Sequence, residues 1–132
     1  LHSFPTRRSS DLVYNPKVIR STMGSISRVN IYIEQSFEKV ISVLKSSGIA
    51  ALAAVVRNGK MLSSYRFDDK CAIVIGNEGR GMSEEHTELC DDRVTIDMHG
   101  RLDSLNASVA AGILCYEIVR QRTFLARKEA SL

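Results

Sequence analysis

Two short apolar runs, each followed by a turn rich in glycine and small polar residues, constrain the fold of this chain most strongly. The first run covers residues 71–75 and the second covers 94–96, and both have the character of a buried strand. Each turn leads into a helix-like segment. Because ligands of α/β proteins collect beyond the carboxyl ends of strands, the two loops predict one shared pocket. Glu78, Ser104 and Asn106 are the polar side chains best placed to point into it.

The glycine pattern of the first loop excludes the common nucleotide-binding loops. Gly76, Gly79 and Gly81 do not have the Gly-x-Gly-x-x-Gly spacing, and no Gly-Lys-Ser/Thr sequence closes a phosphate loop. Glycines still let a backbone approach a ligand closely. The loops therefore suit a ligand that is held by main-chain groups and small residues.

Three short helices are predicted from their capping residues. Each follows a side chain that can accept an N-terminal N–H bond, and two of them end at a glycine. They are a helix from Pro16 to Gly24 after Asn15, a helix over 37–46 or 37–47 between Ser36 and Gly48, and a helix after Ser83 with Glu84 and Glu85 in its first turn.

Strands are predicted between and beside these helices. They cover residues 28–33, 49–56, 71–75 and 94–96, with a strand-like piece around 65–67. Strands that alternate with helices indicate an α/β fold with a mostly parallel sheet and helices on both faces.

The last predicted helix is long, at about residues 105–127, and its apolar face is broad. A terminal helix of this kind packs on its own sheet, and the width of the face also leaves room for a partner subunit. The apolar residues are Val109, Ile113, Tyr116 and Val119 on one side, with Leu114, Ile118 and Leu125 beside them.

Composition places the chain among mildly basic globular proteins. Its 132 residues make at most one domain, and the net charge of +3 permits a nucleic-acid partner without requiring one. No apolar run is long enough to span a bilayer. Cys71, Cys90 and Cys115 are isolated and the histidines are scattered, so neither a metal site nor a disulfide is predicted. Buried free thiols in a reducing cytoplasm are expected instead.

The residues of the two loops resemble two motifs of a known family. The first loop carries Ile75, Gly76, Glu78 and Gly81, and the second carries Ile96, Met98, Gly100, Ser104, Leu105, Asn106, Ser108 and Ala110. This order and spacing resembles motifs two and three of the SpoU/TrmH family of RNA ribose methyltransferases, in the SPOUT superfamily. Asp97 replaces a proline of the third motif and Ala107 replaces a valine. The resemblance covers about residues 14–122.

The resemblance implies a fold, a cofactor and a substrate. It adds a C-terminal trefoil knot to the α/β fold, S-adenosylmethionine as the cofactor, and the ribose 2′-hydroxyl of rRNA or tRNA as the methyl acceptor. Members of this family form dimers through the C-terminal helix, so the resemblance also implies a homodimer. No membrane and no metal are implied.

The resemblance also assigns roles to residues of this chain. Gly76, Ile96 and Leu105 would bind the cofactor through their backbones, Met98 and Gly100 would shape its wall, and Ala53 or Ala54 would touch it. Glu78, Ser104 and Asn106 would form the catalytic acceptor site, although Glu78 would equally suit a structural role that holds the knot. Lys17 and Arg20 would bind RNA phosphates, or would be solvated helix charges.

The family's first motif, Asn-x-Gly-x-x-x-Arg-x-Ala, has no match in the chain and is expected upstream of Tyr14. Residues 1–12 lack periodicity and look like a translated adapter, so they are interpreted as a non-native flank. Residues 13–132 are then interpreted as the C-terminal portion of a methyltransferase catalytic domain. The alternatives are a non-catalytic RNA-binding or dimerising module of the same fold and, less in keeping with both loops, an unrelated α/β domain.

Overall fold

A computed structural model describes residues 13–67, 70–77, 80–98 and 105–129, with the backbone alone for 125–129. The chain divides into two compact units, Leu1–Gln35 and Ser36–Leu132. The predicted flank at 1–12 lies outside the described residues.

The first unit contains the predicted N-terminal helix, α2, which covers Pro16–Ser21. The Asn15 side chain accepts a hydrogen bond of 2.9 Å from the Lys17 N–H, as its residue type predicts for an N-cap. Thr22 is the C-cap, so α2 ends earlier than expected. Gly24, with φ of +83°, instead starts the short 3₁₀ helix η1, Ser25–Arg28.

The strand predicted over residues 28–33 is wrong. Residues 29–34 have no regular structure, and Val29, Tyr32 and Ile33 are exposed. A β-rich composition forms a strand only where a neighbouring strand accepts its backbone hydrogen bonds. Among the described residues, none pairs with this segment.

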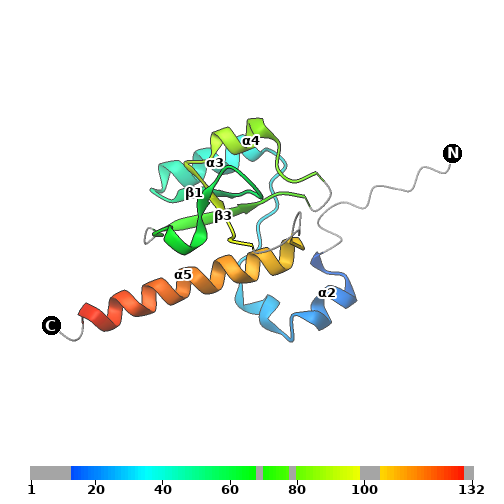
Figure 1. Ribbon diagram of the computed structural model, residues 1–132. Helices are drawn as coiled ribbons and strands as arrows, with labels where there is room; N and C mark the ends of the chain where they lie inside the picture. The colour runs from blue at the N-terminus through cyan, green and yellow to red at the C-terminus, as the bar shows by residue number, and fades with distance from the viewer. Residues whose placement is uncertain (1–12, 68–69, 78–79, 99–104, 130–132) are drawn as a thin grey trace. The chain divides into compact units, whose positions relative to one another are not determined.

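The second unit is built on a four-stranded parallel sheet (Figure 1). Its strands are β1 (Ala50–Ala54), β2 (Lys60–Met61), β3 (Cys71–Ile75) and β4 (Asp92–Thr95), in the order β2-β4-β1-β3. All three pairings are parallel. The parallel sheet is therefore confirmed, with β1 shorter than expected and β4 starting two residues earlier.

The strand-like piece around 65–67 is also wrong, because β2 lies upstream at Lys60–Met61. The short 3₁₀ helix η2, Leu62–Ser64, follows it. Residues 65–67 are extended but pair with the side chain of Gln121 rather than with a strand. Gln121 Nε2 donates to the Tyr65 carbonyl at 2.8 Å, and the Phe67 N–H donates to Gln121 Oε1 at 3.2 Å.

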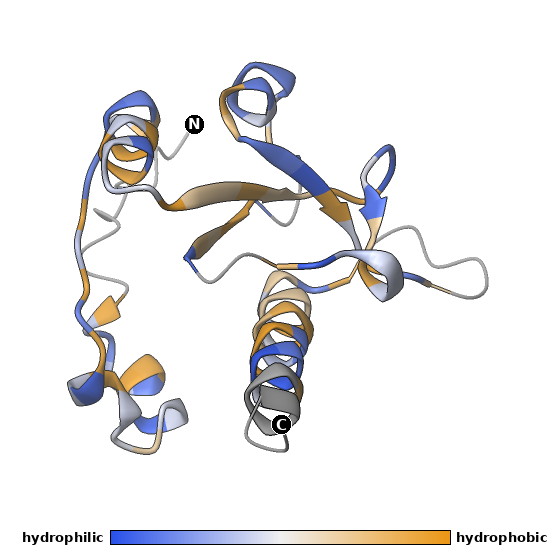
Figure 2. Cartoon of the chain, turned by 90° about the vertical axis from the view of Figure 1, so that its left-hand side faces the viewer, coloured by the Kyte–Doolittle hydropathy of each residue, from blue (hydrophilic) through white to orange (hydrophobic). Residues whose placement is uncertain are grey.

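Helices cover both faces of the sheet, as predicted. The helices α3 (Phe37–Ser46) and α4 (Glu84–Leu89) lie on one side and α5 (Ala107–Glu129) lies on the other (Figures 1 and 2). The predicted caps of α3 and α4 are confirmed, since Ser36 accepts from the Lys39 N–H and Ser83 from the His86 N–H. Gly48 follows α3 with φ of +66°.

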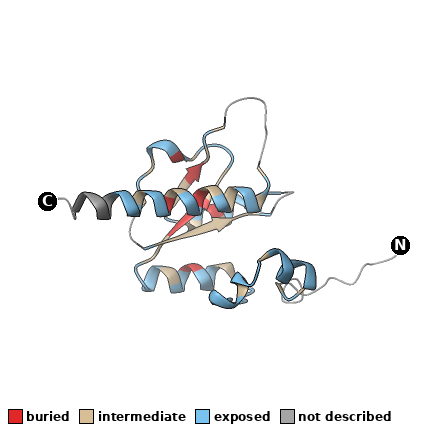
Figure 3. Ribbon diagram, turned by 90° about the horizontal axis from the view of Figure 1, so that it is seen from below, coloured by how far each residue is buried: buried red, intermediate tan, exposed pale blue. Residues whose placement is uncertain are grey.

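The core joins α5 to the sheet through Leu62, Val94 and Leu114, which form one buried cluster. Leu114 and Ile118 are the buried residues of α5, whereas Val109, Tyr116 and Val119 are 49%, 70% and 60% exposed (Figure 3). At 3.6 residues per turn these two sets lie on opposite sides of the helix. The single broad face of the prediction is therefore two faces, one packed and one exposed. The side chain of Leu125 lies outside the described residues.

None of the three cysteines forms a disulfide, and they are not all buried. Cys71 and Cys90 are half-buried and Cys115 is exposed on α5. The expectation of burial is thus wrong for Cys115, whose side chain is exposed although the preceding residue, Leu114, is buried. Within the described ranges, no helix combines the length and the apolar composition needed to cross a membrane.

A carboxylate of α5 gives the fold a pH dependence. Hydrogen bonds from Arg120 and then Gln121 lower the pKa of Glu117 from 4.5 to about 2. Because the pKa is lowered on folding, this stabilisation is present above the unfolded pKa and is lost as the pH falls through the folded pKa. Glu117→Gln should lower the free energy of unfolding by about 1 kcal/mol at neutral pH.

The difference between Glu117→Gln and the unmodified chain should shrink between pH 4.5 and about 2. Urea unfolding followed by circular dichroism at several pH values measures it. The exposed carboxylate of Glu88, which has no ion pair among the described residues, provides the control Glu88→Gln. An equal and pH-independent loss in both variants would contradict this assignment.

Candidate functional site

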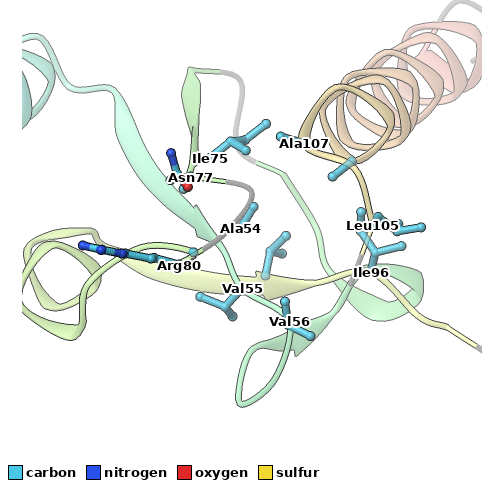
Figure 4. A pocket seen from close by; sticks show the side chains of 13 residues that line it. Ala54, Val55, Val56, Ile75, Asn77, Arg80, Ile96, Leu105 and Ala107 are labelled. Carbon is cyan, nitrogen blue, oxygen red and sulfur yellow. The ribbon is translucent and has the colours of Figure 1, made fainter. Parts of the chain in front are cut away.

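A cavity of about 320 Å³ lies where the carboxyl ends of the strands meet the start of α5 (Figure 4). Three parallel strands, β1, β3 and β4, deliver their following residues to this edge, and the first turn of α5 closes the other side. The predicted shared pocket of the two loops is therefore present. The lining residues are Ala54, Val55, Val56, Ile75, Gly76, Asn77, Arg80, Gly81, Val94, Ile96, Leu105, Ala107 and Ala110.

The first loop is closed by a reciprocal pair of backbone hydrogen bonds. The Asn77 N–H donates to the Gly81 carbonyl at 3.0 Å, and the Gly81 N–H donates to the Asn77 carbonyl at 2.7 Å. Gly81 has φ of +67°, a backbone conformation that is energetically unfavourable for any residue that carries a Cβ. The second glycine of the motif is therefore required by backbone geometry.

Gly76 is required for a different reason, which is the space around it. A Cβ at this position would overlap the backbone of Gly81 and Met82, because the loop folds back across Gly76. The absence of a side chain thus lets the closing residues of the loop lie directly on the end of β3. This close approach places the Gly76 backbone in the cavity wall.

The second loop enters the site at Ile96, which is half-buried and lines the cavity. The next residue, Asp97, accepts hydrogen bonds from the Ser63 N–H at 2.8 Å and from Ser63 Oγ at 2.9 Å. Asp97 stands where the resembling family has proline, and here its carboxylate ties the loop entrance to η2. Met98 is half-buried and is not among the lining residues.

The loop ends at Leu105 and Asn106, immediately before α5. Leu105 lines the cavity. Asn106 Oδ1 accepts from the Ser108 N–H at 2.9 Å and from Ser108 Oγ at 2.5 Å, which makes Asn106 the N-cap of α5. Its backbone carbonyl accepts the first helical bond, from the Ala110 N–H. Asn106 is exposed beside the cavity, and its side-chain oxygen has a structural partner in Ser108.

The structure brings together Gly76, Ile96 and Leu105, the three residues predicted to bind a cofactor through their backbones. Ala54 lines the cavity and Ala53 is fully buried outside its lining. The predicted residues Glu78, Gly100 and Ser104 lie outside the described residues. Lys17 and Arg20 are exposed on α2, in the other unit.

Several residues that line the cavity were not predicted from the sequence. Val55 and Val56 were assigned to a buried strand, yet they follow β1 and form the floor of the cavity. Arg80 and Asn77 lie between Gly76 and Gly81 in the first loop, and their position within the motif is the one sequence signal that could have identified them as lining residues. Among the described residues, no group of three or more His, Cys, Asp or Glu is arranged to hold a metal ion.

The lining has a chemical character that restricts its ligands. Its walls are aliphatic, its loops offer backbone N–H and C=O groups, and Arg80 is its one charged side chain among the described residues. The volume is at the lower end of the roughly 300–1,000 Å³ found for small-molecule pockets. Such a site suits a flat, uncharged ring system held by main-chain groups.

Comparison with known proteins places both loops in a family context. The profile of the SpoU rRNA Methylase family matches residues 4–116. A protein of Staphylococcus aureus (strain COL), named as a TrmH family tRNA/rRNA methyltransferase, is 36% identical over 118 residues, which are 89% of this chain and 47% of that protein. The chain thus spans about half the length of this curated relative.

Two solved structures are also similar. One is the SpoU methyltransferase AviRb from Streptomyces viridochromogenes in complex with the cofactor AdoMet, with a TM-score of 0.75 and 32% identity over 84% of this chain and 44% of that chain. The other comes from work on the 2-OH methylation of C/U34 on tRNA, with a TM-score of 0.78 and 30% identity over 89% of this chain and 76% of that chain.

The requirement for a bare backbone at Gly76 can be tested by a pair of alanine substitutions. Gly76→Ala should lower the free energy of unfolding by about 1–3 kcal/mol, because the new Cβ displaces residues 81 and 82. Gly112→Ala is the control on α5, where a Cβ meets nothing within 4 Å and should stabilise the helix by up to about 1 kcal/mol. Urea unfolding measures both, and stabilisation by both variants would contradict the crowding at Gly76.

Proposed function

The chain belongs to the SpoU rRNA methylase family, and from this membership we propose that it is part of an S-adenosylmethionine-dependent methyltransferase that modifies a ribose 2′-hydroxyl of rRNA or tRNA. One observation carries the proposal. Both family loops converge on a single cavity at the strand ends, with Gly76, Ile96 and Leu105 in its wall. The AdoMet complex of the similar AviRb and the 2-OH methylation studied for the other similar structure support the cofactor and the acceptor.

The residues present fit the proposed cofactor. The backbones of Gly76, Ile96 and Leu105 would hold the adenosine part, and the aliphatic side chains of Val55 and Ile75 would exclude water around it. When bound, S-adenosylmethionine supplies an activated methyl group on a sulfonium. Aliphatic walls hold the reactants without competing nucleophiles, and a rigid loop aligns the acceptor with the methyl group. The reciprocal backbone hydrogen bonds between Asn77 and Gly81 fix the two ends of the first loop.

Asn106 has a restricted chemical role in this proposal. Its Oδ1 accepts two hydrogen bonds from Ser108, and a neutral amide has no basic group at physiological pH. An amide can orient a ribose oxygen but cannot remove its proton. We therefore assign positioning to Asn106, while proton removal belongs to another group, with Glu78 and Ser104 completing the proposed acceptor site.

The remaining expectations concern the topology and surroundings of the protein. A trefoil knot formed by the two loops and a homodimer through α5 belong to the proposal. Val109, Tyr116 and Val119 offer an exposed apolar face of α5 for such a dimer. Lys17 and Arg20, both exposed on α2, are the proposed contacts to RNA phosphates. Free thiols at Cys71, Cys90 and Cys115 support a reducing, cytoplasmic location.

Cofactor binding tests the proposal first. The chain should bind S-adenosylhomocysteine in the micromolar range, measured by isothermal titration calorimetry. Asn106→Ala should weaken binding by about fivefold, because losing the cap of about 1 kcal/mol frays α5 beside the lining residues Leu105 and Ala107. Asn106→Asp keeps the accepting oxygen and should retain most of the affinity. A folded chain that does not bind would contradict the cofactor assignment.

The reaction is tested with methyl-labelled S-adenosylmethionine and total tRNA or rRNA, followed by nuclease digestion of the product. Label on a ribose 2′-oxygen supports the assignment, and label on a base or on the protein overturns it. Cofactor and RNA binding without transfer would instead favour the non-catalytic module of the same fold.

The proposed dimer is tested by sedimentation equilibrium. Tyr116→Glu places a charge in the exposed face of α5 and should raise the dimer dissociation constant at least about tenfold. Val43→Glu, at the 58% exposed Val43 of α3, is the matched control and should leave the constant unchanged. An unmodified chain that stays monomeric at every concentration tested contradicts a dimer of this chain.

A further inference from the structure

Arg80 is the one described lining residue of the cavity that carries a charge. Its side chain is exposed. In Figure 4, Arg80 lies across the cavity from Ile96 and Leu105, and its guanidinium is directed away from them. The positive charge therefore lies at the rim of the site, while the aliphatic residues form its interior.

The residue that follows Arg80 is held by two backbone hydrogen bonds. Arg80 directly precedes Gly81, whose N–H and carbonyl are both bonded to Asn77. Gly76 lies under the same turn and allows it to sit on the end of β3. Because the backbone next to Arg80 is anchored, its side chain has less freedom to lose, which reduces the entropy that binding must offset.

The guanidinium has no competing carboxylate among the described residues. The cations Arg93 and Arg120 are held in ion pairs with Glu84 and Glu117, each at 2.7 Å. Arg80 makes no such pair within the described ranges. An arginine that has no acidic partner among the described residues, at the mouth of an apolar cavity, is suited to a planar anion that arrives from solvent.

We propose that Arg80 binds the RNA phosphodiester next to the ribose that enters the cavity, an inference that rests on the proposed function. On a ribose, the 2′-hydroxyl and the 3′-phosphate are attached to neighbouring carbons, so an acceptor hydroxyl at the cavity mouth brings a phosphate to its rim. Two parallel N–H···O bonds from the guanidinium fix both the position and the orientation of that phosphate. Arg80 thereby selects a nucleotide within a chain over a free nucleoside.

The experiment compares RNA binding with cofactor binding in the full chain. The RNA probe is a fluorescein-labelled single-stranded oligoribonucleotide, whose affinity is measured by fluorescence anisotropy over a series of salt concentrations. Calorimetry with S-adenosylhomocysteine reports the cofactor site. Arg80→Gln should weaken RNA binding about tenfold at low salt and reduce the slope of log K against log salt by about 0.7, the value for one phosphate contact on a single strand. Cofactor affinity should stay unchanged.

Two further variants sharpen the comparison. Arg80→Lys keeps the charge and should retain the salt slope while losing part of the affinity, because an ammonium cannot form the paired bonds. Arg66→Gln removes the same charge from an exposed arginine that is not among the cavity residues, and should leave RNA affinity unchanged.

The outcomes separate this inference from the proposed function. An unmodified folded chain that does not bind S-adenosylhomocysteine overturns the proposed function. Intact cofactor binding with an Arg80→Gln variant that binds RNA normally, or an unmodified chain that does not bind the probe, overturns the role of Arg80 alone. A parallel loss of cofactor affinity in Arg80→Gln overturns the RNA contact and assigns the guanidinium to the cofactor carboxylate instead. An equal loss of RNA affinity in Arg66→Gln also overturns it, because the effect would then come from net charge and not from a contact by Arg80.

Discussion

The packing of Leu114 into the cluster with Val94 and Leu62 is the constraint on which the rest of the second unit depends. Val94 lies in β4, one of the two central strands, so this cluster fixes α5 against the middle of the sheet. Leu114 is seven residues from the start of α5, a distance of about 10 Å along the helix axis. Burying Leu114 therefore places the first turn of α5 opposite the strand ends. The cavity is the space left between that turn and the closed loop at Gly76.

Local signals in the sequence predicted the parts of the fold that local interactions determine. The caps at Asn15, Ser36 and Ser83 were predictable because a cap is a bond between near neighbours. The segment 28–33 was not, because its composition favours a strand but only a distant partner could make one. For the site, the family resemblance of the two motifs predicted Gly76, Ile96 and Leu105 together. The place of Arg80 in the cavity lining depends on which way a side chain leaves a turn, and the motifs carry no such information.

The entrance to the second loop shows how one restraint replaces another. A proline would limit the unfolded chain by fixing φ. Asp97 leaves φ unrestricted, yet its carboxylate accepts two hydrogen bonds from Ser63. The restraint thus exists only in the folded state, and it links the loop to η2 rather than acting on one residue. Order at this point of the chain therefore depends on β2 and η2 being in place.

The side chain of Gln121 makes hydrogen bonds to the backbone of residues 65–67 and not to their side chains. Its amide donates to one peptide carbonyl and accepts from one peptide N–H, as a neighbouring strand would. Peptide groups are the same whichever side chains they carry, proline excepted. Among relatives of this protein, we expect the identity at 67 to vary as long as it fills the same apolar space, whereas Tyr65 also donates its hydroxyl to Asp92 Oδ2 at 3.2 Å. The glutamine should be retained, because no shorter side chain offers a donor and an acceptor at that reach.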